Sequence, residues 1–133
     1  MPHFIVEYTA NIKDDLDIPK LLRQANETLI AQDGVFPIGG IRSRAIELKD
    51  YCIADGRPEY GFLHATLKIG HGRSAAVKNK VCEELFALLK QHLFAGDNAQ
   101  RPLALSMELY EFDEDGTFRH NNLHARFRKN EKV

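Results

Sequence analysis

Four stretches of the chain carry the apolar patterns of β-strands, and two others carry apolar residues at helical spacing. The strand-like stretches are residues 3–8, 41–48, 60–69 and 103–109, and the helical ones run from about 19 to 32 and from 74 to about 94. Capping and turn residues agree with these limits. Asp17 and Ser74 suit helix N-caps, and Asp33-Gly34 suits the end of the first helix.

The predicted elements form two β-α-β units of similar length. This order predicts an α+β fold, a two-layer sandwich in which a four-stranded mixed sheet carries two helices on one face. Right-handed crossovers make the two strands of each unit parallel. The helices cover one face only, and the strand patterns place apolar residues on the other face as well. We therefore expect oligomerisation through the sheet.

Composition places the chain among ordinary single-domain proteins. It has 133 residues, 44% of them hydrophobic and 28% charged, with a net charge of -1. A near-neutral charge argues against a nucleic-acid partner, and no apolar run approaches the roughly 18 to 20 residues that span a membrane. Cys52 and Cys82 are isolated and form no CxxC pair, so we expect a reduced, cytoplasmic setting.

Pro2 follows Met1 directly and opens the first predicted strand. Removal of Met1, which is usual before a small residue, would leave the Pro2 nitrogen as a secondary amine. Burial and neighbouring cations both lower the pKa of an amine, so this nitrogen could act as a base near neutral pH. Proline at this position is common, and its meaning depends on the rest of the chain.

Arg42 and Arg44 follow two glycines at the start of the second predicted strand. Side chains alternate along a strand, so the two guanidinium groups lie on the same face. Such a pair suits recognition of carboxylates, because arginine can donate two parallel hydrogen bonds. A solvated strand edge is the alternative.

Residues 70–74, Gly-His-Gly-Arg-Ser, join a predicted strand to the second helix. Free backbone N–H groups and the positive end of the helix dipole make this junction suitable for an anion. Arg73 adds a full positive charge that the dipole disfavours, which indicates an anionic ligand.

Three other patterns in the sequence are weaker indications of a binding site. Residues 70–75 match a dinucleotide-binding glycine pattern formally, but the unit is too short for a doubly wound sheet. Residues 111–122 resemble the start of a calcium loop without its final glutamate, so we expect a surface turn. His120 and His124 lack a third ligand, so we expect no metal.

Taken together, these segments resemble the tautomerase superfamily, whose members use an N-terminal proline, and within it the 5-carboxymethyl-2-hydroxymuconate Δ-isomerase family. The segments that carry the resemblance are residues 2–7, 34–37, 40–44, 54–56, 66–70, 72–74, 121–122 and 124–125. The resemblance covers nearly the whole chain. It departs mainly at residues 126–133, which add charge.

The resemblance implies a homotrimer whose subunit is a single tautomerase-like domain over residues 1–133, without cofactor or metal. The family moves a proton along a conjugated dienol in the bacterial breakdown of homoprotocatechuate. By this resemblance Pro2 is the proton shuttle, and Arg42 and Arg73 bind the carboxylates and the oxyanion of a small polycarboxylate substrate. Arg44 is a further substrate-binding candidate, with a structural role as its alternative.

Three alternatives stay open at this point. The first is another superfamily reaction on a 2-oxo or 2-hydroxy-dienoic acid, and a mono-acid would not need both Arg42 and Arg73. The second is a non-catalytic oligomeric module on the same fold, in which Pro2 has no chemical role. The third is a ferredoxin-like RNA binder, which the net charge and the lack of paired strand aromatics oppose.

Overall fold

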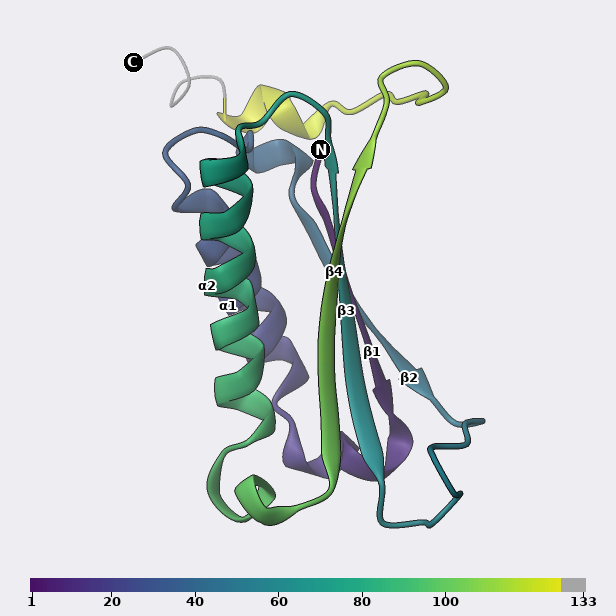
Figure 1. The fold of residues 1–133 in the computed structure, drawn as a ribbon. Coiled ribbons are helices and arrows are strands. Elements are labelled where there is room, and N and C mark those ends of the chain that lie inside the picture. The colour runs from purple at the N-terminus through teal and green to yellow at the C-terminus, as the bar shows by residue number, and fades with distance from the viewer. Residues whose placement is uncertain (128–133) are drawn as a thin grey trace.

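The computed structural model describes residues 1–127 and shows the expected α+β sandwich, with both helices on one face of a four-stranded mixed sheet (Figure 1). Its strands and helices are β1 (His3–Thr9), α1 (Ile18–Ile30), β2 (Arg42–Leu48), β3 (Gly61–Gly70), α2 (Ala75–Leu93) and β4 (Leu103–Phe112). Short 3-10 segments are η1 (Ala10–Asp15), η2 (Ile38–Gly40), η3 (Gly96–Gln100) and η4 (Leu123–Phe127). Most of the charged tail 126–133 lies outside the described residues.

The strand order in the sheet is β2-β1-β3-β4. Strands β1 and β2 are parallel, as are β3 and β4, which confirms the pairing expected from right-handed crossovers. The two units meet through the antiparallel pair β1 and β3, with His3 opposite Lys68. As a result, the starts of β1 and β2 and the ends of β3 and β4 lie at the same end of the sheet (Figure 1).

Both helices begin at the residues expected from the sequence. The Asp17 carboxylate accepts a hydrogen bond from Lys20 N at 3.2 Å, and the Ser74 hydroxyl accepts one from Val77 N at 3.2 Å. Helix α1 ends at Ile30, two residues before the expected limit, because the chain then turns through Asp33 with a φ of 53°. The capping residues therefore position the loops that lead to β2 and follow β3.

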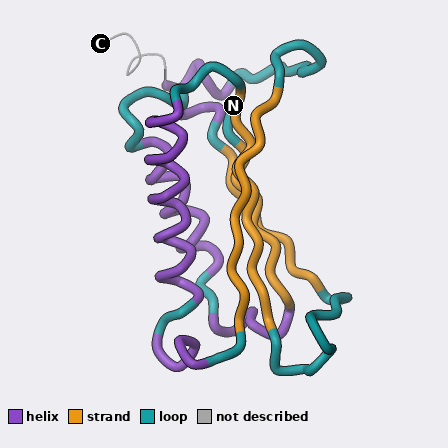
Figure 2. The backbone as a smooth tube through the Cα atoms, in the orientation of Figure 1, coloured by secondary structure: helices purple, strands orange, loops and turns teal. Residues whose placement is uncertain are grey.

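The hydrophobic core lies between the helices and the sheet, the two layers visible in Figure 2. Alternate residues of β1 and β3 are buried in it, and α1 and α2 each contribute one buried stripe. The largest fully buried side chains include Phe4 of β1, Leu67 of β3 and Leu85 of α2. The core thus fixes the two central strands, whose ends carry the N-terminus and the β3–α2 loop.

Within residues 1–127, the opposite face of the sheet carries no helix (Figure 1). Exposed apolar side chains are present on it, with Ile46 46% and Tyr110 52% accessible. The expectation of an apolar open face is nevertheless only partly right. The neighbouring outward positions hold Glu7 opposite His64, and His64 binds Glu108 at 3.1 Å. Cross-strand polar pairs therefore share this face with the apolar residues.

Truncation of a core side chain should test how far the fold depends on β1. Phe4 is fully buried, so Phe4→Ala should lower the free energy of unfolding by about 3–5 kcal/mol through lost burial and a residual cavity. Phe118, which is 95% exposed, is the matched control, and Phe118→Ala should stay within about 0.5 kcal/mol of the parent. Urea unfolding measures both. Equal losses would contradict the core described here.

Candidate active site

The N-terminus lies at the end of the sheet where β1 and β2 begin and β3 and β4 end (Figure 1). A cavity of about 260 Å³ opens beside it. The cavity is lined by Met1, Pro37, Gly40, Gly70, Arg73, Phe112, Glu114, Arg119 and His124. These residues come from segments far apart in the sequence, which the sheet topology and the C-terminal segment bring to one place.

Pro2 is buried next to Met1, which lines the cavity, and the Pro2 nitrogen forms an amide with Met1. The Pro2 carbonyl accepts a hydrogen bond from Arg42 N at 3.1 Å. Arg42 Nη1 in turn donates to Met1 Sδ at 3.0 Å. The start of β2 therefore holds the first two residues at the cavity, and places Arg42 beside the position that Met1 occupies.

The surroundings of the N-terminal amine favour its neutral form. Burial is the main cause that lowers the pKa of the Met1 amine, and the charges of Arg73 and then Arg119 lower it further. Glu114 raises the pKa and Arg42 lowers it, and the net direction is downward. An amine at this end of the sheet is thus desolvated and faces three guanidinium groups and one carboxylate.

Arg73 lies at the cavity, with its guanidinium turned back from the start of α2. Arg73 Nη1 donates to the Gly70 carbonyl at 3.0 Å, and Nη2 donates to the Val35 carbonyl at 3.2 Å. The guanidinium also lies 5.0 Å from the centre of the Phe36 ring. These contacts explain how a cation is accommodated beside a helix N-terminus, and they fix its position relative to the N-terminus.

Arg42 and Arg44 lie on the same face of β2, as the strand period predicts, because Ser43 between them bonds to Asn26 of α1 on the opposite face. Arg44 is nevertheless separated from Arg73. It lines a second cavity of about 190 Å³, together with Met1, His3, Lys68, Phe112 and Thr117. Arg44 Nη1 lies 3.1 Å from His3 Nδ1. Burial, Arg44 and Arg42 together lower the pKa of His3.

The cavity contains four side chains to which the sequence alone assigned no role. These are Phe112 at the end of β4, Glu114 and Arg119 in the loop that follows it, and His124 of η4. Residues 121–122 and 124–125 supported the family resemblance, which was the one signal that this region matters. Nothing in the local sequence distinguishes Arg119 from other surface cations.

The C-terminal segment reaches the cavity by packing η4 against η2. Asn121 Nδ2 donates to the Gly39 carbonyl at 2.9 Å. A Cβ atom on Gly39 would lie 2.9 Å from the backbone nitrogen of His124, closer than side chains tolerate. Glycine at position 39 is therefore required for this close approach, which holds His124 in the cavity wall.

The segment that resembles a calcium loop forms a turn instead. Thr117 Oγ1 donates to the Asp113 carbonyl at 2.6 Å, and Glu111 and Asp113 both contact His71, at 2.7 and 3.2 Å. Among residues 1–127, no group of three or more histidine, cysteine or acidic side chains is arranged to hold a metal ion. No helix in the same part of the chain is long and apolar enough to cross a membrane.

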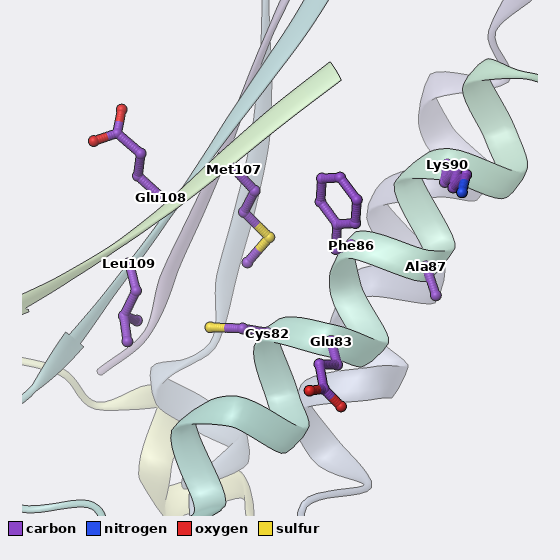
Figure 3. Close-up of a pocket in the computed structure, with 8 residues that line it drawn as sticks. All are labelled: Cys82, Glu83, Phe86, Ala87, Lys90, Met107, Glu108 and Leu109. Carbon is purple, nitrogen blue, oxygen red and sulfur yellow. The ribbon is translucent and has the colours of Figure 1, made fainter. Parts of the chain in front are cut away.

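A larger cavity, of about 560 Å³, lies between α2 and the edge strand β4 (Figure 3). Cys82 and Phe86 of α2 and Met107 of β4 give it an apolar floor, while Glu108 points to the other side of the strand. Burial raises the pKa of the Cys82 thiol, so that thiol is a poor nucleophile at neutral pH. The smaller cavity at the N-terminus, with its cations and amine, is the better candidate for chemistry.

Comparison with known proteins shows one consistent set of relatives. A family model described as 5-carboxymethyl-2-hydroxymuconate isomerase matches residues 2–127. A 5-carboxymethyl-2-hydroxymuconate Delta-isomerase of Escherichia coli is 45% identical over 128 residues, which are 96% of this chain and 100% of that protein. The crystal structure of a 5-carboxymethyl-2-hydroxymuconate isomerase from Deinococcus radiodurans R1 has a TM-score of 0.89 at 48% identity, over 96% of this chain and 94% of that one. The crystal structure of a 5-carboxymethyl-2-hydroxymuconate delta-isomerase has a TM-score of 0.84 at 31% identity, over 96% and 93%.

A doubled β-α-β unit that forms one four-stranded mixed sheet is the fold of the tautomerase superfamily, as the sequence resemblance implied. The chain belongs to the 5-carboxymethyl-2-hydroxymuconate isomerase family, and it is an enzyme of the isomerase class.

The contact between Gly39 and His124 can be tested by adding one methyl group. Gly39→Ala should displace η4 from η2, raise KM for the substrate and lower the free energy of unfolding by about 1–3 kcal/mol, because the backbone must move. Asn121→Ala removes the hydrogen bond to Gly39 from the other side and should change KM in the same direction. Steady-state kinetics and urea unfolding measure both effects. An unchanged KM in both variants would show that η4 does not shape the site.

Proposed function

We propose that the enzyme isomerises 5-carboxymethyl-2-hydroxymuconate, with the Pro2 amine as acid and base after Met1 is removed. The observation that carries this proposal is the placement of the N-terminus beside a cavity, where burial and three arginines favour a neutral amine. Loss of Met1 would leave the Pro2 nitrogen as the terminal amine at the start of β1. The family membership supports the substrate, because the relatives carry the name of this reaction.

The proposed reaction is a proton shift with no net gain or loss of atoms. The neutral Pro2 nitrogen takes the proton from the 2-hydroxyl group, and the oxygen forms a carbonyl as the conjugated double bonds move along the chain. The protonated amine then gives its proton to the far carbon of the former diene, where a C–H bond forms. The amine returns to its neutral state, and the product is an unsaturated 2-oxo acid.

The arginines have two functions in this proposal. The substrate carries three carboxylates, so cations at the cavity bind it, and a guanidinium near the 2-oxygen stabilises the dienolate charge that develops. The same cations lower the pKa of the Met1 amine, and by the same repulsion they would keep the Pro2 amine neutral and available as a base. The chain as a whole has a net charge of -1, so this end of the molecule concentrates positive charge in an otherwise near-neutral protein.

Arg73 and Arg42 are the substrate-binding residues that the contacts support most directly. Arg73 lines the cavity, and Arg42 reaches the side chain of Met1, whose place becomes free when Met1 is removed. Arg44 remains a candidate for the same role, because it lines the second cavity, which Met1 also borders.

We further propose that the enzyme acts in the cytoplasm as a homotrimer of single-domain subunits. The open face of the sheet supports an oligomer, since Ile46 and Tyr110 are exposed there and no helix in the described part of the chain covers them. The polar pairs on that face, such as His64 with Glu108, would set the register between copies. The trimeric state itself comes from the family resemblance.

Retention of Met1 should abolish the proposed reaction. With Met1 present the Pro2 nitrogen is a tertiary amide, whose lone pair is delocalised and unavailable for a proton. We expect a sample shown by mass measurement to retain Met1 to be inactive in an isomerase assay. The same sample, after treatment with a methionine aminopeptidase, should become active. Full activity of the Met1-containing protein would refute the amine mechanism.

The acidic side of the pH profile should respond to the charge of Arg73. The base works only when neutral, so kcat/KM rises with pH through the pKa of the free amine. Arg73 lowers the pKa of the Met1 amine, and we expect it to act in the same direction on the Pro2 amine. Arg73→Gln should therefore raise the pKa of Pro2 and move the rise in kcat/KM to higher pH. Arg73→Lys keeps the charge and is the matched control, which should shift the profile less. The weaker substrate contact should raise KM in both variants.

The melting temperatures of the two Arg73 variants measure any loss of stability from the missing hydrogen bonds to Gly70 and Val35. A profile that does not move in Arg73→Gln would separate Arg73 from the titration of the base.

A further inference from the structure

Arg119 differs from the other arginines at the cavity in what holds it. Arg119 Nη2 pairs with Glu114 Oε2 at 3.0 Å, and both side chains line the cavity. The Arg119 side chain is 43% exposed and that of Glu114 is 74% exposed. A solvent-exposed ion pair of this kind contributes little to stability, about 0–1 kcal/mol. The guanidinium can therefore exchange its partner carboxylate at small cost.

Arg73 lacks this freedom, because two backbone carbonyls and the ring of Phe36 hold its guanidinium. Arg42 is placed beside the N-terminus by β2, where its backbone is bound to the Pro2 carbonyl and its Nη1 donates to Met1 Sδ at 3.0 Å. Their positions are set by β2 and by the β3–α2 loop. Arg119 is instead presented by the loop after β4, at the outer side of the cavity.

Hydrogen bonds within the loop after β4 hold the backbone that carries the Glu114–Arg119 ion pair. Thr117 N donates to the Glu114 carbonyl at 3.1 Å, and Thr117 Oγ1 donates to the Asp113 carbonyl at 2.6 Å. These two bonds close the turn from Asp113 to Thr117, which Arg119 follows by two residues. Asn121 then attaches the following residues to Gly39. The turn is thus tied at both ends while the Arg119 side chain remains accessible.

We infer that Arg119 is the specificity residue that binds the carboxymethyl carboxylate of the substrate, and that Glu114 occupies it in the free enzyme. This inference rests on the proposed function. The substrate has two carboxylates at the ends of its conjugated chain and a third on a side arm. Arg73 and Arg42, which lie beside the N-terminus, bind the conjugated chain, which must be held for proton transfer. Arg119, at the outer side of the cavity, binds the carboxymethyl group, and the carboxylate of that group replaces Glu114 as its partner.

The test compares two substrates, 5-carboxymethyl-2-hydroxymuconate and 2-hydroxymuconate, which lacks the carboxymethyl arm. Assays are run above the acidic rise of the pH profile, so that the amine is neutral in every variant. Arg119→Ala should lower the ratio of kcat/KM for the first substrate over the second about tenfold, mainly through KM, because a charge-assisted hydrogen bond in a partly exposed site is lost. Arg119→Lys should restore part of that ratio.

Glu114→Gln should change KM for the tricarboxylate in the opposite direction to Arg119→Ala. The amide no longer holds Arg119 or repels the substrate, so KM for the tricarboxylate should fall about two- to fivefold. If the ion pair only stabilised the loop, Glu114→Gln and Arg119→Ala would raise KM for both substrates alike. That outcome overturns the inference. Arg57→Ala is the matched control, since it removes an exposed arginine paired with Asp55 at 3.6 Å, away from the cavity.

The outcomes for the two proposals can be told apart. A parent enzyme that does not isomerise the tricarboxylate, or that is active with Met1 retained, contradicts the proposed function. An active parent with an unchanged substrate ratio in Arg119→Ala leaves the proposed function standing and refutes the role of Arg119.

Discussion

The antiparallel pairing of β1 with β3 is the constraint on which the site depends. Each β-α-β unit alone would place the start of its first strand beside the start of its second. Joining the units antiparallel brings the ends of β3 and β4 to the start of β1 and β2. Pro2, Arg42 and Arg73 meet for this reason. The buried alternation of β1 and β3, which fixes their register, is thus also what assembles the proposed site.

The electrostatics of the site work against the stability of a charged N-terminus. A desolvated amine beside guanidinium groups is costly when protonated, and the neutral form relieves that cost. The cations are themselves stabilised by other partners, Arg73 by the Gly70 and Val35 carbonyls and Arg119 by Glu114. The arrangement that disfavours a terminal ammonium is therefore tolerated by the fold, and it is what a base near neutral pH requires.

Local patterns in the sequence were sufficient for the fold but only in part for the site. The alternation of β3, the caps at Asp17 and Ser74 and the crossover rule all act within short stretches or simple topology, and the structure agrees with them. The shared face of Arg42 and Arg44 followed from the strand period, yet Arg44 borders a different cavity from Arg73. The polarity of the open face and the position of Arg119 at the cavity depend on contacts between distant segments, which no local pattern encodes.

The return of the C-terminal segment to the N-terminus has a further physical consequence. Glu114, Arg119 and His124 form the outer wall of the cavity, but no residue of η4 is buried. Its anchors at Gly39 are a hydrogen bond and a close backbone contact, each weaker than the buried apolar stripe that holds α2. The inner wall, which comes from the ends of β3 and β4, the β3–α2 loop and η2, is therefore the better anchored part, as the proposed proton transfer requires. The outer wall is the part of lower local stability, where substrate entry and exchange of an ion pair cost least.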